Sequence, residues 1–214
     1  MAPPASSPDS KQNRAARWVL PDLALAVSLI TLLYCLLIYD GGRKLFRDSD
    51  TGWHIRTGEW ILNHGQVPVT DLFSFTRPNA PWYAWEWLSD VLMALAYRAG
   101  GMAAVVFGSL LLLCLVSLLL FDFLRKRSGN TTLAWLMTLL VAAGSSLHWL
   151  ARPHLFTMLF LLLFYRAFHS WSHSRHWLLL PFMALWTNLH GGFFLGVALA
   201  AIERHRPAWW RPPA

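Results

Sequence analysis

Long apolar runs with almost no charged side chains constrain the fold of this chain more than any other feature. A helix that crosses a bilayer needs about 20 apolar residues. Runs of that length cover 18–39, 99–121, 131–151 and 177–202, and a shorter run covers 153–165. Only 14% of the 214 residues are charged, against about 25% in soluble domains. The sequence therefore predicts an all-α, polytopic transmembrane helix bundle of five or six spans.

The choice between five and six spans depends on the last run. Residues 177–202 include Asn188 and the pair Gly191-Gly192, so they form either one kinked span or two short helices that turn at 188–192. Arg204 follows the run, and cytoplasmic loops are enriched in Lys and Arg. The hairpin returns Arg204 to the cytoplasm and is therefore favoured.

Short clusters of Lys and Arg between the runs predict the orientation of the chain. Lys11, Arg14 and Arg17 precede the first run, and residues 125–127, Arg-Lys-Arg, follow the second. The positive-inside rule then places the N-terminus in the cytoplasm and residues 40–98 outside, as in an integral protein of a bacterial inner membrane. The basic residues form no continuous stripe, so the formal charge of +7 does not indicate nucleic-acid binding.

The two ends of the chain differ in composition from the part between them. Residues 1–17 are polar and rich in Pro and Ser, which predicts a disordered cytoplasmic tail. Residues 18–203 form the predicted membrane domain, with 40–98 as its first outer loop. Residues 204–214 change composition abruptly, and we expect an irregular tail that results from a truncation or a frame change.

The first outer loop begins with an acidic stretch, RDSDTGWHIRTGEW, at 47–60. We expect a helix from Asp50 to Asn63, ended by Gly65, and a second interfacial helix at 85–97. Asp48 and Asp50 have an alternative role as helix caps. Two carboxylates this close also suit a divalent cation such as Mg²⁺ or Mn²⁺, and one of them suits a general base.

Several stretches resemble the GT-C superfamily of membrane glycosyltransferases. SDTGWHIRTGEWILNHG is similar to the aspartate–aromatic–arginine stretch of oligosaccharyltransferase catalytic subunits. DLFSFTRPNAPWYAWEWLSDVLMALAYRAGG, RPHLFT and NLHGGFFLG resemble stretches of uncharacterised bacterial members. The resemblance covers about 18–202 and implies an enzyme, or the N-terminal part of one, that transfers a sugar from a polyprenyl-phosphate donor to an acceptor at the outer membrane face. GT-C enzymes have considerably more spans than this chain provides.

The resemblance also implies roles for individual residues. Asp50 would be the catalytic base or a metal ligand, with Asp48 as its partner. The leaving phosphate needs cationic stabilisation by a metal or by Arg and His. The candidate substrate-binding residues are polar side chains of the first loop and of the ends of the apolar runs: His54, Arg56, Glu86, Arg152, His154, Asn188 and His190. Their structural alternatives are snorkelling to lipid headgroups and interhelical hydrogen bonds.

Two other functions compete with the enzyme. A non-catalytic membrane protein, as a remnant or an assembly partner, would have acidic loop residues that point to water. A small transporter would have polar residues that face one another near the bilayer midplane. The enzyme requires Asp48 or Asp50 close to Arg152 and His190 on the outer side. The sequence identifies neither the sugar, the acceptor nor any protein partner.

Overall fold

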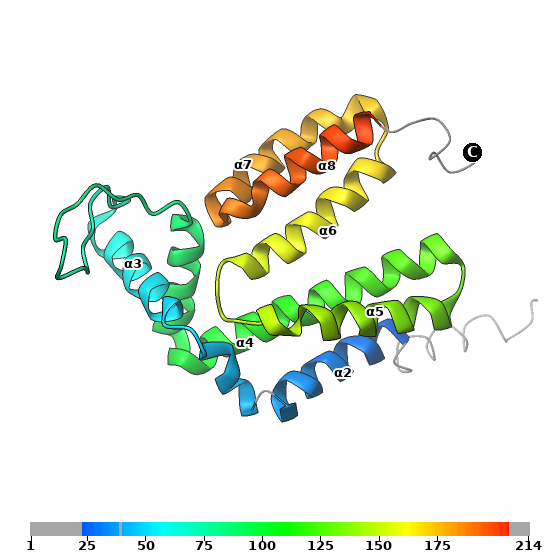
Figure 1. Ribbon diagram of the computed structural model, residues 1–214, viewed down its shortest axis with the longest axis horizontal. Coiled ribbons are helices and arrows are strands. Elements are labelled where there is room, and N and C mark those ends of the chain that lie inside the picture. The colour runs from blue at the N-terminus through cyan, green and yellow to red at the C-terminus, as the bar shows by residue number, and fades with distance from the viewer. Residues whose placement is uncertain (1–22, 39, 206–214) are drawn as a thin grey trace, which may run out of the picture.

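The computed structural model describes residues 23–38 and 40–205, most of which lie in helices (Figure 1). The α-helices are α2 (Leu23–Ile38), α3 (Asp50–His64), α4 (Trp87–Ser128), α5 (Thr131–Ser145), α6 (His154–Ser170), α7 (Leu179–Leu189) and α8 (Phe194–Arg204). Four short 3-10 helices link them: η1 (Asp40–Phe46), η2 (Ser146–His148), η3 (His173–Leu178) and η4 (Gly191–Phe193). The described residues form no strand, only an isolated bridge between Thr70 and Pro81. The all-α class is therefore confirmed. The predicted tail 1–17, the start of the run at 18–39 and most of 204–214 lie outside the described residues.

α4 changes direction at Gly100 and Gly101, whose backbone angles are not helical. Gly101 has a φ of 62°, a left-handed value that glycine adopts without a steric penalty. The kink divides α4 into a short arm, 87–99, and a long arm, 102–128. The short arm packs against α3, and the long arm packs against α2 and α5. These arms match the separate helix and apolar run predicted at 85–97 and 99–121.

The remaining helices extend away from this layer. α6 leads from the α4–α5 layer to a hairpin of α7 and α8 (Figure 1). Gly196 of α8 lies so close to Trp186 and Met183 of α7 that an added Cβ would sit 2.7 Å from the Trp186 ring. The hairpin that the sequence favours for 177–202 is therefore confirmed, and its turn runs through His190 and η4.

Two helices in the described part of the chain are long and apolar enough to cross a membrane, Trp87–Ser128 and Thr131–His148. This number is smaller than the five or six predicted. α7 and α8 have 11 residues each and reach about 16 Å, roughly half of a bilayer core. Large apolar side chains such as Leu37, Phe107 and Leu140 are 76%, 62% and 63% exposed. Such an apolar outer surface supports association with a membrane.

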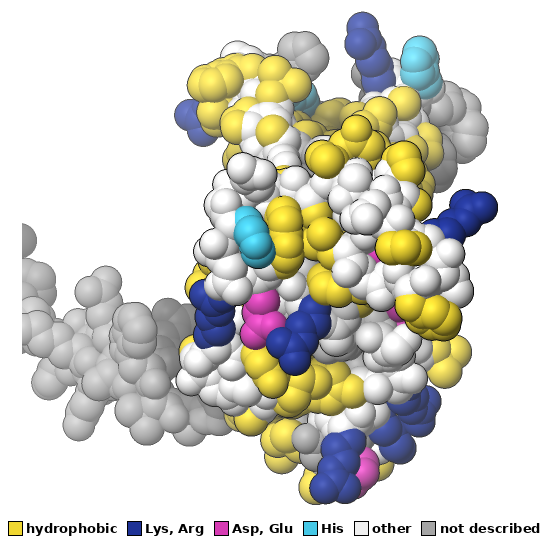
Figure 2. Space-filling view, turned by 90° about the vertical axis from the view of Figure 1, so that its left-hand side faces the viewer, with side chains coloured by type: hydrophobic (Ala, Val, Ile, Leu, Met, Phe, Trp, Pro, Cys, Tyr) yellow, Lys and Arg dark blue, Asp and Glu magenta, His cyan; other side chains and the backbone are white. Residues whose placement is uncertain are grey.

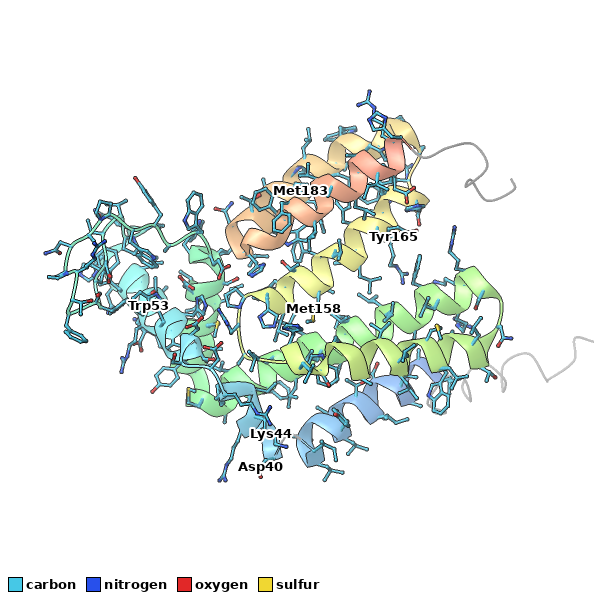
Figure 3. The ribbon with its side chains drawn as sticks, viewed as in Figure 1. Asp40, Lys44, Trp53, Met158, Tyr165 and Met183 are labelled. Atoms are coloured by element: carbon cyan, nitrogen blue, oxygen red, sulfur yellow. The ribbon has the colours of Figure 1, made fainter. Side chains whose placement is uncertain are left out.

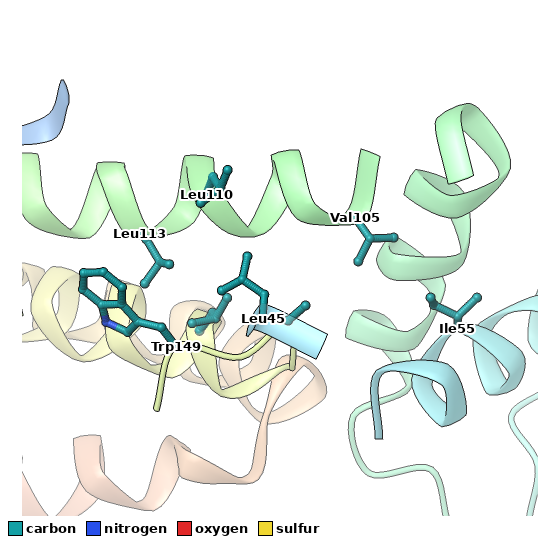
Figure 4. Packing of buried hydrophobic residues seen from close by; sticks show 8 residues of the cluster. Leu45, Ile55, Val105, Leu110, Leu113 and Trp149 are labelled. Carbon is teal, nitrogen blue, oxygen red and sulfur yellow. The ribbon is translucent and has the colours of Figure 1, made fainter. Parts of the chain in front are cut away.

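A buried apolar cluster lies where η1, α3, α4 and the α5–α6 link meet (Figure 4). Its labelled members are Leu45, Ile55, Val105, Leu110, Leu113 and Trp149. Met158 lies on the side of α6 that faces α4 and α5, and it packs against the same cluster (Figure 3). Ile55 and Ile61 of α3 are both buried, and α3 packs against α4. The cluster holds the acidic start of α3 beside residue 151.

Candidate active site

Two hydrogen bonds fix the chain segment that carries Arg152. The backbone N–H of Ala151 donates to the Leu45 carbonyl at 2.9 Å, and the Thr51 hydroxyl donates to the Ala151 carbonyl at 3.0 Å. Both Ala151 and Thr51 are buried. The α5–α6 link is thereby attached to η1 and to the first turn of α3, a hundred residues away in sequence.

This attachment brings Arg152 onto the two predicted acidic residues. The Arg152 guanidinium pairs with Asp48 at 2.6 Å and also with Asp50. Asp48 in addition accepts the backbone N–H of Asp50 at 2.9 Å, so it caps α3 as well. The Asp50 N–H and the Arg152 charge lower the pKa of Asp48 below its ordinary value. A guanidinium has five N–H donors, and these two pairs engage Nη1 and Nη2 of Arg152.

A resident divalent cation does not fit this pair of carboxylates as they are arranged. Carboxylate oxygens suit Mg²⁺ or Mn²⁺, but Arg152 already holds Asp48 and Asp50. Among the described residues, no group of three or more His, Cys, Asp or Glu side chains is placed to hold a metal ion. The predicted cation at Asp48 and Asp50 therefore stays a prediction, and Arg152 supplies the positive charge in the structure.

The packing of α3 on the short arm of α4 positions His54. A Cβ on Gly58 would overlap the carbonyl oxygen of Asp90, so glycine at 58 permits this close approach. One turn earlier on α3, His54 Nδ1 lies 2.7 Å from Asp90 Oδ1. Asp90 is only 2% exposed, and the His54 side chain is 12% exposed. The pair is largely shielded from water.

Glu86 lies between two histidines at the start of α4. Its Oε1 is 3.3 Å from His190 Nε2, and its Oε2 is 3.9 Å from His54 Nε2. Both distances are within the range of an ion pair, and the second is too long for a hydrogen bond. The backbone N–H of Gly191 also approaches Glu86 Oε1, at 3.5 Å.

The hydrogen bonds around His190 determine which ring nitrogen carries its proton. Gly192 N–H donates to His190 Nδ1 at 2.9 Å. Thr157 Oγ1 accepts the Trp186 indole N–H at 2.9 Å, and its own hydroxyl lies 2.8 Å from His190 Nδ1. With two donors on Nδ1, the proton of the neutral ring is on Nε2, facing Glu86. Burial lowers the pKa of His190, which also favours the neutral ring despite the nearby carboxylate.

Three other predicted site residues differ in how they are placed relative to His190 and Glu86. Asn188 accepts the Trp87 indole N–H at 2.6 Å and donates to the Ala184 carbonyl, so it links α7 to α4. The His154 ring lies 6.4 Å from the His190 ring, and burial lowers the pKa of His154. Arg56 is not part of the cluster: it pairs with Glu59 on the exposed face of α3, and its side chain is 67% exposed.

Arg152 is one of the residues that line an apolar groove of about 260 Å³. Both arms of α4 and the start of α6 form it, with lining residues that include Leu92, Met93, Ala96, Leu112 and Phe156. Among the described residues that line it, Arg152 alone is charged. The groove therefore joins an apolar surface to a guanidinium.

The cluster lies at one end of the helices, where α3, the α5–α6 link and the α7–α8 turn come together (Figure 1). Figure 2 views this end and shows acidic and basic side chains in contact near its centre, with a histidine above them. A polar path that continued across the described helices would suit a transporter, and acidic residues in open water would suit an inert fragment. In the described residues the carboxylates of the site are paired at one end of the fold, and the Asp50 side chain is 47% exposed.

Sequence reasoning missed the contributions of Thr51 and Thr157 and the pairing of Asp90 with His54. Thr157 lies in the RPHLFT stretch, and a hydroxyl there in an apolar helix was a usable signal. Thr51 and Asp90 act through partners 100 and 36 residues away, which local spacing does not show. Comparison with known proteins finds no family model, no curated relative and no solved structure that matches this chain.

Proposed function

We propose that this chain is a GT-C-like glycosyltransferase, or the N-terminal part of one, that uses a polyprenyl-phosphate sugar donor. The observation that carries the proposal is the position of Arg152. It pairs with both residues of the predicted acidic motif and lines an apolar groove. A polyprenyl chain requires an apolar groove, and a phosphate requires cationic donors at its end.

The proposed donor occupies the groove with its prenyl chain and presents its phosphate to Arg152. A planar guanidinium binds phosphate oxygens well, and Arg152 lines the groove that would hold the lipid chain. In this arrangement Asp48 and Asp50 orient Arg152. The predicted base role of Asp50 is a separate possibility that this arrangement does not require. No step of the proposal requires a divalent cation.

The proposed location follows from the Lys and Arg clusters. Arg125, Lys126 and Arg127 lie in the last turn of α4, at the opposite end of the long arm from the site. We place these residues and the N-terminus in the cytoplasm, and the site at the outer face of a bacterial inner membrane. An acceptor at the outer face would then reach His54, Glu86 and His190.

Donor turnover tests the proposal without knowledge of the acceptor. Membranes that contain the full chain are supplied with a radiolabelled polyprenyl-phosphate sugar and a cell-envelope extract, and release of polyprenyl phosphate is followed by chromatography. We expect the wild type to turn over the donor and Arg152→Gln to lose most of this turnover. The exposed control Arg56→Gln should turn over the donor at the wild-type rate. The absence of turnover in the wild type, or equal turnover in Arg152→Gln, would overturn the proposal.

A further inference from the structure

A proton acceptor is needed wherever a hydroxyl becomes a nucleophile, and the site contains four carboxylates. They are Asp48, Asp50, Glu86 and Asp90. Arg152 forms ion pairs with the first two, and Glu86 lies between two histidines, with its Oε1 3.3 Å from His190 Nε2 and near the Gly191 N–H. Asp90 is buried against His54. Each of the four carboxylates therefore lies beside a guanidinium or an imidazole.

The two central histidines differ in the nitrogen that each one leaves open. His190 accepts two hydrogen bonds on Nδ1, so its Nε2 carries a proton and cannot accept another. His54 has the opposite arrangement. Its Nδ1 lies against the Asp90 carboxylate at 2.7 Å, so Nδ1 carries the proton and Nε2 keeps its lone pair. Among the described residues, Glu86 Oε2 at 3.9 Å is the polar group that faces this nitrogen, too far to occupy it.

We infer that His54 Nε2 is the general base of the site and that Asp90 is its positioning residue. The inference rests on the proposed transferase function and names the group that activates the acceptor. A buried carboxylate behind an imidazole fixes the tautomer and stabilises the imidazolium that forms. Glu86 on the other side of the ring adds a second negative charge beside it.

In the proposed step, His54 Nε2 takes the proton of the acceptor hydroxyl, and the acceptor oxygen forms a bond to the anomeric carbon of the sugar. The bond between that carbon and the phosphate oxygen breaks, and its electron pair leaves with the polyprenyl phosphate, whose charge faces Arg152. The proton on His54 returns to water afterwards.

The charged groups that face His54 come from three elements. Asp90 and Glu86 belong to α4 or its start, Asp48 precedes α3, and His190 lies between α7 and α8. Asp90 and Glu86 both lie beside the imidazolium that forms in the step.

The first arm of the experiment does not require donor turnover by the protein. ¹⁵N-histidine NMR of the wild-type chain in detergent, with His54→Gln for assignment, reports which nitrogen carries the proton at neutral pH. We expect the proton on Nδ1 of His54 and on Nε2 of His190. A proton on Nε2 of His54 would overturn the inference whether or not the chain is a transferase.

The second arm measures donor turnover. We expect His54→Gln to lower kcat by about 10²- to 10⁴-fold with little change in KM, and added imidazole to restore part of the rate to His54→Ala. The control His64→Gln lies on the same helix, where His64 is exposed and stacks on Trp60, and should keep the wild-type rate. If the wild type turns over donor and His54→Gln does so equally, the base assignment is wrong and the transferase proposal survives. If the wild type turns over no donor, both fall.

Discussion

Thr51 contributes position rather than chemistry to the site. It is 2% exposed, and its hydroxyl satisfies the carbonyl of the residue before Arg152. A buried carbonyl that loses its donor costs about 1–3 kcal/mol. The orientation of Arg152 toward Asp48 and Asp50 therefore depends on a residue that binds neither of them.

Replacement of Thr51 by valine tests this dependence. We expect Thr51→Val to lower the free energy of unfolding by about 1–3 kcal/mol and to weaken binding of a polyprenyl phosphate, both measured on the purified chain in detergent. Thr138→Val is the matched control, because Thr138 is also buried but donates to the Ala134 carbonyl of its own helix. Equal losses of polyprenyl-phosphate binding in the two variants would contradict a specific role for Thr51.

The buried histidines predict how stability changes with pH. In the folded chain, burial lowers the pKa of His190 and His154 below the ordinary value of 6.5. As the pH falls through 6.5, the unfolded chain therefore binds more protons than the folded chain. Stability is then complete above about pH 6.5 and decreases below it. We expect the unfolding midpoint to be a few degrees lower at pH 5.5 than at pH 7.5, and the difference to be smaller in His190→Gln. A midpoint that rises on acidification would contradict burial of the two rings.

At the scale of elements, the contact of α3 with the short arm of α4 assembles the His54–Asp90 pair. Gly58 makes that contact, since a Cβ there would overlap the Asp90 carbonyl. Overpacking of this kind costs about 1–3 kcal/mol, and it would separate the two helices at the site.

Alanine substitutions on α3 test the contact. We expect Gly58→Ala to destabilise the chain by about 1–3 kcal/mol and to lower donor turnover. Gly52→Ala lies on the same helix with nothing within 4 Å of the added Cβ, and should stabilise slightly, by about 0.4–1 kcal/mol. The thermal unfolding midpoints of both variants measure these changes. A Gly58→Ala variant as stable as the wild type would show that α3 and α4 lie farther apart than in the structure.

Local sequence signals predicted the elements better than their contacts. The start of α3 at Asp50 and its glycine end at Gly65 follow from capping chemistry, and the α7–α8 turn follows from Gly191-Gly192. The pairing of the acidic motif with Arg152 was a requirement of the enzyme hypothesis, and the structure contains that pairing. The His54–Asp90 and Thr157–His190 pairs depend on helix packing, which no local pattern contains. Among the described residues, two helices reach spanning length, fewer than the five or six predicted. Apolar content alone does not reveal that α7 and α8 have only 11 residues each.

At the scale of the whole molecule, the proposed topology separates the site from the basic end of α4. Arg56 and Lys126 lie in these two regions with similarly exposed side chains, 67% and 65%. In a chain whose Cys35 and Cys114 are replaced by alanine, we expect Arg56→Cys to react with an impermeant maleimide in intact spheroplasts. Lys126→Cys should react only after the membrane is opened. Labelling of both before opening would contradict the orientation.

The central claim is that Arg152 receives the phosphate of a polyprenyl lipid whose chain lies in the adjacent groove. The most direct test compares the affinity of the purified full chain for a polyprenyl phosphate and for the polyprenol of the same length. We expect the wild type and Arg56→Gln to prefer the phosphate. Arg152→Gln should bind the phosphate about 10- to 100-fold more weakly, as expected for the loss of a charged hydrogen bond. Equal affinity of the wild type for both lipids, or unchanged phosphate binding by Arg152→Gln, would contradict the claim.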